Sequence, residues 1–294
     1  MVANSAGDGA APATAGAASS APGTTLNSEV PLLQLRDIGK TFGPVQALTG
    51  INLDVPVGQV TALVGDNGAG KTTLIKCIAG IHEPSSGEIV WKGRPVHLHS
   101  PKEAASLGIA TVYQDLALAD NLDIVQNMLL GREKTHFGLL DEISMELIAK
   151  KTLADLSVTT VRSIRQPVGS LSGGQRQAVA VAKAVMQDAR LVIMDEPTAA
   201  LGVSQTEMVL NLITTLASRG HAVIVVSHNL TDVFRVADRI AVLYLGTLAA
   251  VGPASEFDSQ SVVEYMTTGS ATRRSNGGGA EPAASPGVSR GSEG

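Results

Sequence analysis

Aromatic side chains are scarce in this chain of 294 residues, at 3% of the sequence with a single tryptophan. Hydrophobic residues nevertheless make up 44% of it, so a core must be built mainly from alanine and aliphatic residues. Such a core suits helices that pack on buried parallel strands. The length allows one large domain or two small ones.

The sequence also lacks features that are typical of secreted, nucleic-acid-binding and membrane-bound proteins. The single cysteine, Cys77, has no partner for an internal disulfide, which fits a reducing compartment. The net charge of −5 gives no basic excess for nucleic acid, and no Lys/Arg-rich run would hold an anionic membrane. No apolar run is long enough to cross a bilayer, and the N-terminus lacks a secretory signal. We therefore expect a cytoplasmic protein that binds no nucleic acid.

Both ends of the chain are poor in large apolar residues. Residues 1–28 are mostly Ala, Gly, Ser, Thr and Pro, and residues 269–294 have a similar composition. Segments of this kind bury too little apolar surface to offset the entropy lost on ordering. We predict two disordered tails around one folded domain at residues 29–268.

Short runs of β-branched and aliphatic residues mark the strands of this domain. Residues 60–64, 191–194 and 222–226 are each apolar and followed by polar residues or glycine. Helical patterns at residues 174–187 and 205–218 precede the second and third runs. This alternation predicts a parallel sheet with helical crossovers, and it places ligand chemistry at the carboxyl ends of the strands.

Two further segments complete the predicted α/β fold. Residues 32–38 and 46–55 indicate a pair of strands that form an antiparallel β subdomain beside the main sheet. Residues from about 116 to 168 have a mostly helical pattern and indicate an inserted helical subdomain. No internal repeat is visible, so we expect one such unit in the chain.

A glycine-rich loop after the first run fits the phosphate-binding pattern G-x-x-x-x-G-K-[ST] completely. Its glycines allow backbone N–H groups to surround a phosphate, and the next helix directs its positive end at the same charge. Lys71 would reach the β- and γ-phosphates of a nucleotide, and the Thr72 hydroxyl would bind Mg²⁺. The flanking strand and helix argue against a glycine-rich turn that binds nothing. The expected nucleotide-binding residues are Gly65, Asp66, Asn67, Gly68, Ala69, Gly70, Lys71, Thr72 and Thr73.

The P-loop alone is compatible with kinases, GTPases and transport ATPases. The run at 191–194 ends in Asp195 and Glu196, which can supply the remaining chemistry. Asp195 can hold Mg²⁺ through water, and Glu196 can polarise the water that attacks the γ-phosphate. Acidic residues after strands also cap helices, but the P-loop favours the catalytic interpretation. We therefore predict Mg²⁺-dependent hydrolysis of a nucleoside triphosphate.

The segment LSGGQ at Leu171–Gln175 lies between the P-loop and Asp195. It is the signature of ABC ATPases, which this chain resembles over almost all of the predicted folded domain. The Ser172 hydroxyl and the following glycines offer an anion site at a helix N-terminus. The resemblance implies that this site closes on ATP held by a second copy, so that a dimer shares two sites. The signature residues expected to contact nucleotide are Ser172, Gly173, Gly174 and Gln175.

The resemblance also assigns three residues that would carry little weight alone. Gln114 resembles the Q-loop glutamine, with a catalytic and metal-binding role. His228, after the run at 222–226 that we take as the last core strand, resembles the switch histidine that contacts the γ-phosphate. Phe42 is placed like the aromatic that stacks on adenine. Considered alone, Gln114 could be a loop residue, His228 a helix N-terminal residue and Phe42 a core residue. Together with LSGGQ and the DEPT sequence at Asp195, the functional interpretation is favoured.

The sequence departs from the commonest pattern after DEPT, because Ala199–Gly202 reads A-A-L-G where many members have S-A-L-D. Gly202 therefore lacks the usual carboxylate. AALGV, and NLDIVQNMLLGRE beginning at Asn121, resemble the ATPases of bacterial ribose-, xylose- and fructose-type sugar importers. The resemblance implies a motor subunit at the cytoplasmic face of the cell membrane. Its implied partners are permease transmembrane subunits and, indirectly, a solute-binding protein.

Other members of the same family remain as alternatives. The ATPase of another importer, for example for amino acids, would share these motifs. Maltose-type motors carry a regulatory domain where this chain has only a low-complexity segment after Thr267. A soluble ABC protein of translation or DNA repair usually has two fused units or a coiled-coil insertion. An inactive regulator is disfavoured by the intact Lys71, Asp195, Glu196 and His228.

Overall fold

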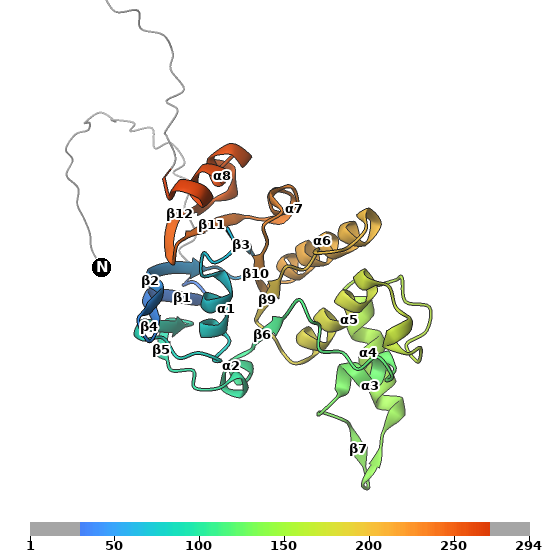
Figure 1. The fold of residues 1–294 in the computed structure, drawn as a ribbon. Helices are drawn as coiled ribbons and strands as arrows, with labels where there is room; N and C mark the ends of the chain where they lie inside the picture. The colour runs from blue at the N-terminus through green and yellow to red at the C-terminus, as the bar shows by residue number, and fades with distance from the viewer. Residues whose placement is uncertain (1–29, 271–294) are drawn as a thin grey trace, which may run out of the picture.

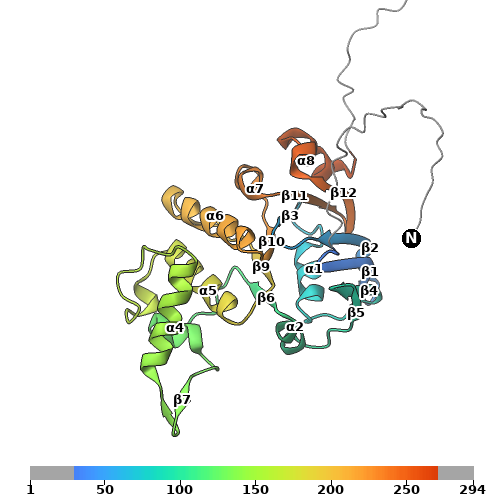
Figure 2. The ribbon, with the colours of Figure 1, turned by 180° about the vertical axis from the view of Figure 1, so that it is seen from behind.

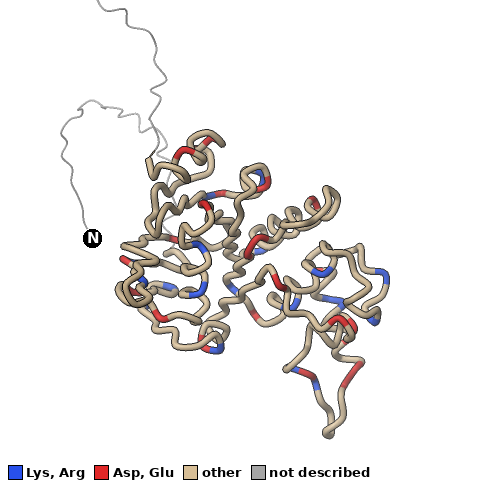
Figure 3. Tube along the Cα trace, in the orientation of Figure 1, with Lys and Arg blue, Asp and Glu red and all other residues tan. Residues whose placement is uncertain are grey.

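A computed structural model describes residues 30–270 of the chain (Figure 1). The predicted tails, 1–28 and the part of 269–294 beyond Ser270, lie outside the described residues. Within the described part, acidic and basic residues are interspersed along the trace (Figure 3). No helix there is long and apolar enough to cross a membrane.

The centre of the molecule is a six-stranded sheet in which five neighbouring strands are parallel. The sixth strand, β12, is antiparallel to β11 at one edge. The central strands are buried along almost their whole length because they are built from aliphatic residues, as a parallel sheet covered on both faces requires. In spatial order the strands are β12 (Thr247–Pro253), β11 (Arg239–Tyr244), β3 (Val60–Gly65), β10 (Ala222–Val226), β9 (Leu191–Asp195) and β6 (Ile109–Val112).

Alternate residues of these strands supply separate parts of the core. In β9, Val192 and Met194 pack with the helices α3, α4, α5 and α6, whereas Leu191 and Ile193 pack with α1. The sheet is therefore covered on both faces, as the sequence pattern predicts. The helices are α1 (Lys71–Ile78), α2 (Pro101–Leu107), α3 (Ile124–Leu129), α4 (Glu142–Asp155), α5 (Gly173–Met186), α6 (Val203–Ser218), α7 (Leu230–Val236) and α8 (Ser259–Thr268).

A second, antiparallel sheet lies beside α1 (Figures 1 and 2). Its neighbouring strands β1 and β2 are the predicted strand pair, and they are longer than the sequence pattern suggested. The sheet has four strands in the spatial order β2 (Val45–Val55), β1 (Leu33–Phe42), β4 (Ser86–Trp91) and β5 (Arg94–Val96).

Helices α3 and α4 lie next to α5 on the side away from the antiparallel sheet (Figures 1 and 2). A small hairpin of β7 (Thr135–His136) and β8 (Leu139–Leu140) separates them, so the region around 116–168 is not helical throughout. Arg165 joins the two helices, since its guanidinium contacts Asp123 at the start of α3 and Glu142 and Glu146 in α4.

The expectation that residues 222–226 form the last core strand is wrong. β11 follows at Arg239–Tyr244 and pairs in parallel with β3, and β12 then pairs with β11. β11 begins with the charged Arg239, and its partner β3 lies far away in the sequence. The carboxyl ends of β3, β9 and β10 nevertheless meet at one edge, which brings the predicted motifs together.

Candidate active site

The phosphate-binding loop connects β3 to α1. Three of its glycines have positive φ angles, 159° at Gly65, 82° at Gly68 and 105° at Gly70. An L side chain rarely adopts the values at Gly68 and Gly70, so these turns require glycine. Gly70 caps α1 without any side-chain hydrogen bond to the helix terminus. The first N–H groups of α1 are thus open to an anionic ligand.

A polar cavity of about 320 Å³ lies over this loop. Gln114, Asp195 and Glu196 reach it from other parts of the sheet edge, so residues from three separate motifs share one site. Of the predicted loop residues, Gly65, Asp66 and Ala69 do not line the cavity. The lining residues are Asn67, Gly68, Gly70, Lys71, Thr72, Thr73, Gln114, Asp195 and Glu196.

The Lys71 ammonium is held by backbone carbonyls. Its Nζ donates to the carbonyl oxygen of Gly65 at 2.6 Å and to that of Asp66 at 3.0 Å. No carboxylate within the described residues forms an ion pair with it. The positive charge therefore stays at the mouth of the phosphate-binding loop, where an anion can use it.

Asp195 and Glu196 place two carboxyl groups at the end of β9. Burial, and then the neighbouring Glu196, raise the pKa of Asp195, while Lys71 and Lys76 partly offset the shift. Glu196 has a left-handed backbone with φ of 50°, and its N–H donates to the carbonyl of Val226 at 2.9 Å. That conformation is uncommon for a residue with a side chain and is fixed here by the neighbouring strand.

His228 reaches this pair of carboxyl groups from the end of β10. Its Nδ1 lies 2.9 Å from Oε1 of Glu196. The His228 side chain is 68% exposed and that of Glu196 is 18% exposed, so the histidine is the more solvent-exposed partner of this contact. The sequence analysis predicted both residues but not their contact. His228 does not itself line the cavity.

The oxygen atoms around the cavity suit a magnesium ion. Thr72 offers a hydroxyl, Gln114 an amide oxygen and Asp195 a carboxylate, and all three residues line the same space. Mg²⁺ prefers such hard oxygen ligands and takes few from the protein, keeping water and phosphate oxygens for the rest. Among the described residues no cluster of three or more His, Cys, Asp or Glu forms a cage for a metal. The donors present therefore fit a magnesium ion bound together with a nucleotide.

The LSGGQ segment does not line the cavity of its own chain. Ser172 caps α5, because its Oγ accepts the N–H of Gln175 and the Gln175 side chain accepts the N–H of Ser172. A Cβ at Gly173 would lie 2.7 Å from a methyl carbon of Leu201, and one at Gly174 would lie 3.3 Å from the Cα of Gln205. The two glycines thus let the start of α5 approach α6 closely.

Phe42 stands at the end of β1 with 42% of its surface exposed. His82 meets its ring edge-on, with 5.2 Å between the ring centroids, and the Lys40 ammonium lies 5.1 Å from the ring centroid. The sequence analysis missed both neighbours. The Lys40 contact had a signal in the sequence, since residues two apart on a strand share one face. Phe42 does not line the cavity over the loop.

Comparison with known proteins places this chain among transport ATPases. Residues 48–199 match the ABC transporter family. The chain is 45% identical to a xylose/arabinose import ATP-binding protein of Sulfolobus acidocaldarius, over 81% of this chain and 94% of that protein. It is 43% identical to a fructose import ATP-binding protein of Rhizobium meliloti, over 82% of this chain and 95% of that protein.

The fold agrees with these matches. A solved structure of a nucleotide-free ATP-binding cassette from an ABC transporter superposes with a TM-score of 0.66 at 26% sequence identity. The alignment covers 76% of this chain and 91% of that cassette. The chain therefore belongs to the ABC transporter family, as one of its ATP-hydrolysing subunits.

Proposed function

We propose that this chain is the motor subunit of a monosaccharide importer and that it hydrolyses ATP at the cytoplasmic face of the cell membrane. The observation that carries the catalytic part is the cavity shared by Lys71, Gln114, Asp195 and Glu196. The sugar class is supported by the similarity to the xylose/arabinose and fructose import proteins along nearly their whole length.

In the proposed reaction, water attacks the γ-phosphate of ATP. Lys71 and the amides of the loop would hold the charge of the β- and γ-phosphates, since backbone carbonyls keep that ammonium at the mouth of the loop. Glu196 orients the water or accepts its proton, and His228 contacts the γ-phosphate from the same side. Catalysis then comes mainly from positioning and charge stabilisation.

The metal would be held by Thr72, Gln114 and Asp195. Bound Mg²⁺ supplies neutralisation of the phosphate charge during the reaction. Burial, and then the neighbouring Glu196, raise the pKa of Asp195 because both disfavour its negative charge. A divalent cation bound there would offset this effect. Adenine would stack on Phe42, whose exposed ring is available beside Lys40.

We propose a dimer of two copies with two shared sites. The support is that Ser172 lies at the N-terminus of α5, outside the cavity of its own chain. The Ser172 hydroxyl can still donate its proton, since the capping bond uses only a lone pair. Ser172, Gly173, Gly174 and Gln175 would thus complete the site of the other copy.

Permease transmembrane subunits and, through them, a solute-binding protein are the proposed partners. We place the permease contact beside Gln114, next to α3 and α4, where movement would reach the nucleotide site. Deletion of the gene should abolish uptake of one monosaccharide, and complementation with the intact gene but not with Glu196→Gln should restore it. Uptake assays across pentoses, hexoses and amino acids test the substrate class. A defect confined to amino acids would overturn the sugar assignment and leave the motor assignment standing.

A further inference from the structure

Two aromatic residues adjoin the phosphate-binding loop and could serve as a platform for the nucleobase. Tyr113 precedes Gln114, which lines the cavity over the loop. Phe42 ends β1, and the adjoining strand β2 places the carbonyl oxygen of Ala47 3.0 Å from a Cβ built on Gly70 of the loop. Nucleobases stack on aromatic rings whatever their sequence. The surroundings of each ring therefore decide which one is suited to the role.

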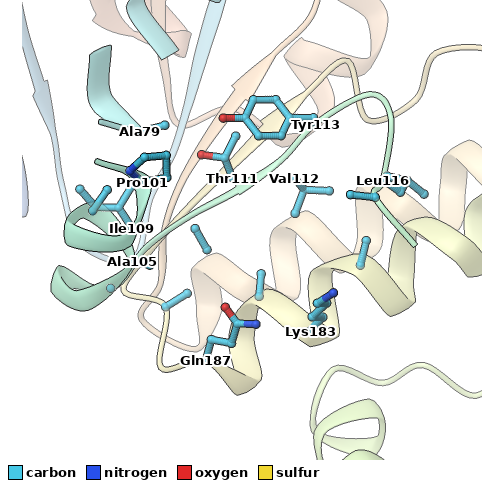
Figure 4. Close-up of a pocket in the computed structure, with 17 residues that line it drawn as sticks. Ala79, Pro101, Ala105, Ile109, Thr111, Val112, Tyr113, Leu116, Lys183 and Gln187 are labelled. Atoms are coloured by element: carbon cyan, nitrogen blue, oxygen red, sulfur yellow. The ribbon is translucent and has the colours of Figure 1, made fainter. Parts of the chain in front are cut away.

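Tyr113 lines a different cavity from the one over the loop. This second cavity, of about 250 Å³, lies between α2, β6 and α5, with alanines such as Ala105 and Ala184 in its wall (Figure 4). It shares no lining residue with the cavity over the loop. A base stacked on Tyr113 would thus lie in a space separate from that of its phosphates. Phe42 is the better candidate.

Lys40 holds a positive charge against the Phe42 ring. Its ammonium lies 5.1 Å from the ring centroid. The same Nζ donates a hydrogen bond to the carbonyl oxygen of Glu83 at 2.7 Å. In the part of the chain that the structure describes, no carboxylate forms an ion pair with Lys40. A neutral partner therefore fixes the cation in place, and its charge remains available to attract the ring.

His82 is the second contact of the ring, and it connects the ring to α1. The two rings are inclined at 75° with 5.2 Å between their centroids. The backbone N–H of His82 donates to the carbonyl oxygen of Lys76 in α1 at 3.1 Å. Lys40 lies near the same helix, since its ammonium partly offsets the burial that raises the pKa of Cys77 to about 11. Phe42 is thus held against the helix that begins at the phosphate-binding loop.

We propose that Lys40 and His82 are positioning residues for the nucleobase, because they hold the Phe42 ring in the orientation in which adenine stacks on it. This proposal rests on the proposed stacking of adenine on Phe42 and adds the residues that prepare the ring. A ring at the end of a strand loses rotational freedom when a base binds, and a ring that is already held loses less. Loss of either contact should therefore weaken nucleotide binding without slowing the chemical step.

The hydrolysis assay of the purified full chain tests this role, with inorganic tripolyphosphate as an inhibitor that lacks a base. Phe42→Ala should raise the KM for ATP at least roughly fivefold. Lys40→Met and His82→Ala should each raise it roughly two- to fivefold, with kcat and the inhibition constant of tripolyphosphate unchanged. Lys40→Arg keeps a cation that stacks on aromatic rings and should retain the wild-type KM. Lys151→Met, which changes an exposed lysine of α4, is the matched control.

A double-mutant cycle separates positioning from a general loss of stability or charge. In the Phe42→Ala background, Lys40→Met should have no further effect on KM, because the ring through which it acts is gone. A further rise in KM there, or weaker inhibition by tripolyphosphate, would show that Lys40 acts on the phosphates or the fold, and the proposal would fail. A wild-type KM in both Lys40→Met and His82→Ala would also overturn it. A wild-type KM in Phe42→Ala would instead remove the proposed stacking on Phe42, and the positioning role with it.

Discussion

His228 Nδ1 and Glu196 Oε1, 2.9 Å apart, join the ends of two neighbouring strands of the central sheet. The contact orients a carboxylate that is otherwise free to rotate, and it does so beside the cavity over the phosphate-binding loop. In the proposed reaction, this contact would hold Glu196 in place as the base and leave its other oxygen for the attacking water.

Glu196→Gln should keep ATP binding but lower turnover by roughly 10²- to 10⁴-fold, because an amide cannot accept the proton of water. Phosphate release measures turnover, and gel filtration should reveal an accumulated ATP-bound dimer. Glu207→Gln is the matched control, since Glu207 pairs with Arg235 on the surface. Wild-type turnover in Glu196→Gln would remove the role given to this residue.

The shared site can be tested by mixing two inactive variants. Lys71→Ala removes the charge at the phosphates, and Ser172→Arg places a bulky side chain where two copies must approach. Each variant alone should be nearly inactive. After random exchange, about half of the dimers are mixed and about a quarter of all sites are whole, so ATP hydrolysis should rise.

Two outcomes of that experiment would count against shared sites. The first is a mixed dimer that demonstrably forms and yet binds no ATP tightly. The second is full activity of Ser172→Arg alone, since the signature serine would then not touch nucleotide. Tight ATP binding without hydrolysis in the mixed dimer would indicate instead that both sites must act together.

Gly65 should be required for stability even in the absence of nucleotide. A Cβ at Gly65 would lie 2.5 Å from the carbonyl oxygen of Leu243 in β11, whereas a Cβ at Gly68 would meet nothing within 4 Å. We expect Gly65→Ala to lose about 3 kcal/mol of unfolding free energy through overpacking. Gly68→Ala should lose only about 1 kcal/mol, from its left-handed backbone. Urea unfolding of both variants measures the difference, and equal losses would contradict this account.

The sequence predicted the central strands well because a strand buried on both faces is a continuous apolar run. β3, β9 and β10 lie within one residue of their predicted bounds. β6 and β11 escaped prediction. β6 has only four residues, and β11 opens with a charge, so neither stands out from its surroundings. The β7–β8 hairpin was missed for a similar reason, since each strand has two residues.

The candidate site likewise has a part that the sequence predicted and a part that only the structure shows. Residue identity and order were enough to predict that Lys71, Asp195 and Glu196 would share one site, and the family resemblance added Gln114. The contact of His228 with Glu196, and that of Phe42 with His82, depend on how distant segments pack. No local pattern records such distances, so these contacts required the structure.

Asp195 should make the ligand-free protein less stable as the pH rises. Its pKa is raised in the folded chain, so the folded state binds the proton more tightly than the unfolded state. The stability due to the protonated form is present at low pH and is lost as the pH rises through the raised pKa. Asp195→Asn should therefore melt at a higher temperature than wild type at neutral pH. The difference should shrink toward about pH 4, near the ordinary pKa of an aspartate, and a variant that melts lower at neutral pH would contradict this sign.

Gly202→Asp should stabilise α6. Gly202 caps this helix with ordinary extended backbone, φ −73°, and without a side-chain hydrogen bond, and a Cβ added there would meet no atom within 4 Å. An Asp there can accept an N–H of the first turn, which is worth a few tenths of a kcal/mol relative to glycine. Urea unfolding checks the gain, with Gly202→Ala as the variant without an acceptor. Equal stability of the two variants would show that no capping bond forms.

The order of the central sheet also bears on how the protein is made. β3, which leads into the phosphate-binding loop, has β10 and β11 as its two neighbours. Both come from residues 222–244, so β3 leaves the ribosome long before either partner exists. Its aliphatic edge must stay unpaired through most of synthesis, a period in which such strands are prone to aggregate. The nucleotide site is therefore among the last parts of the chain that can assemble, although its loop is among the first to be translated.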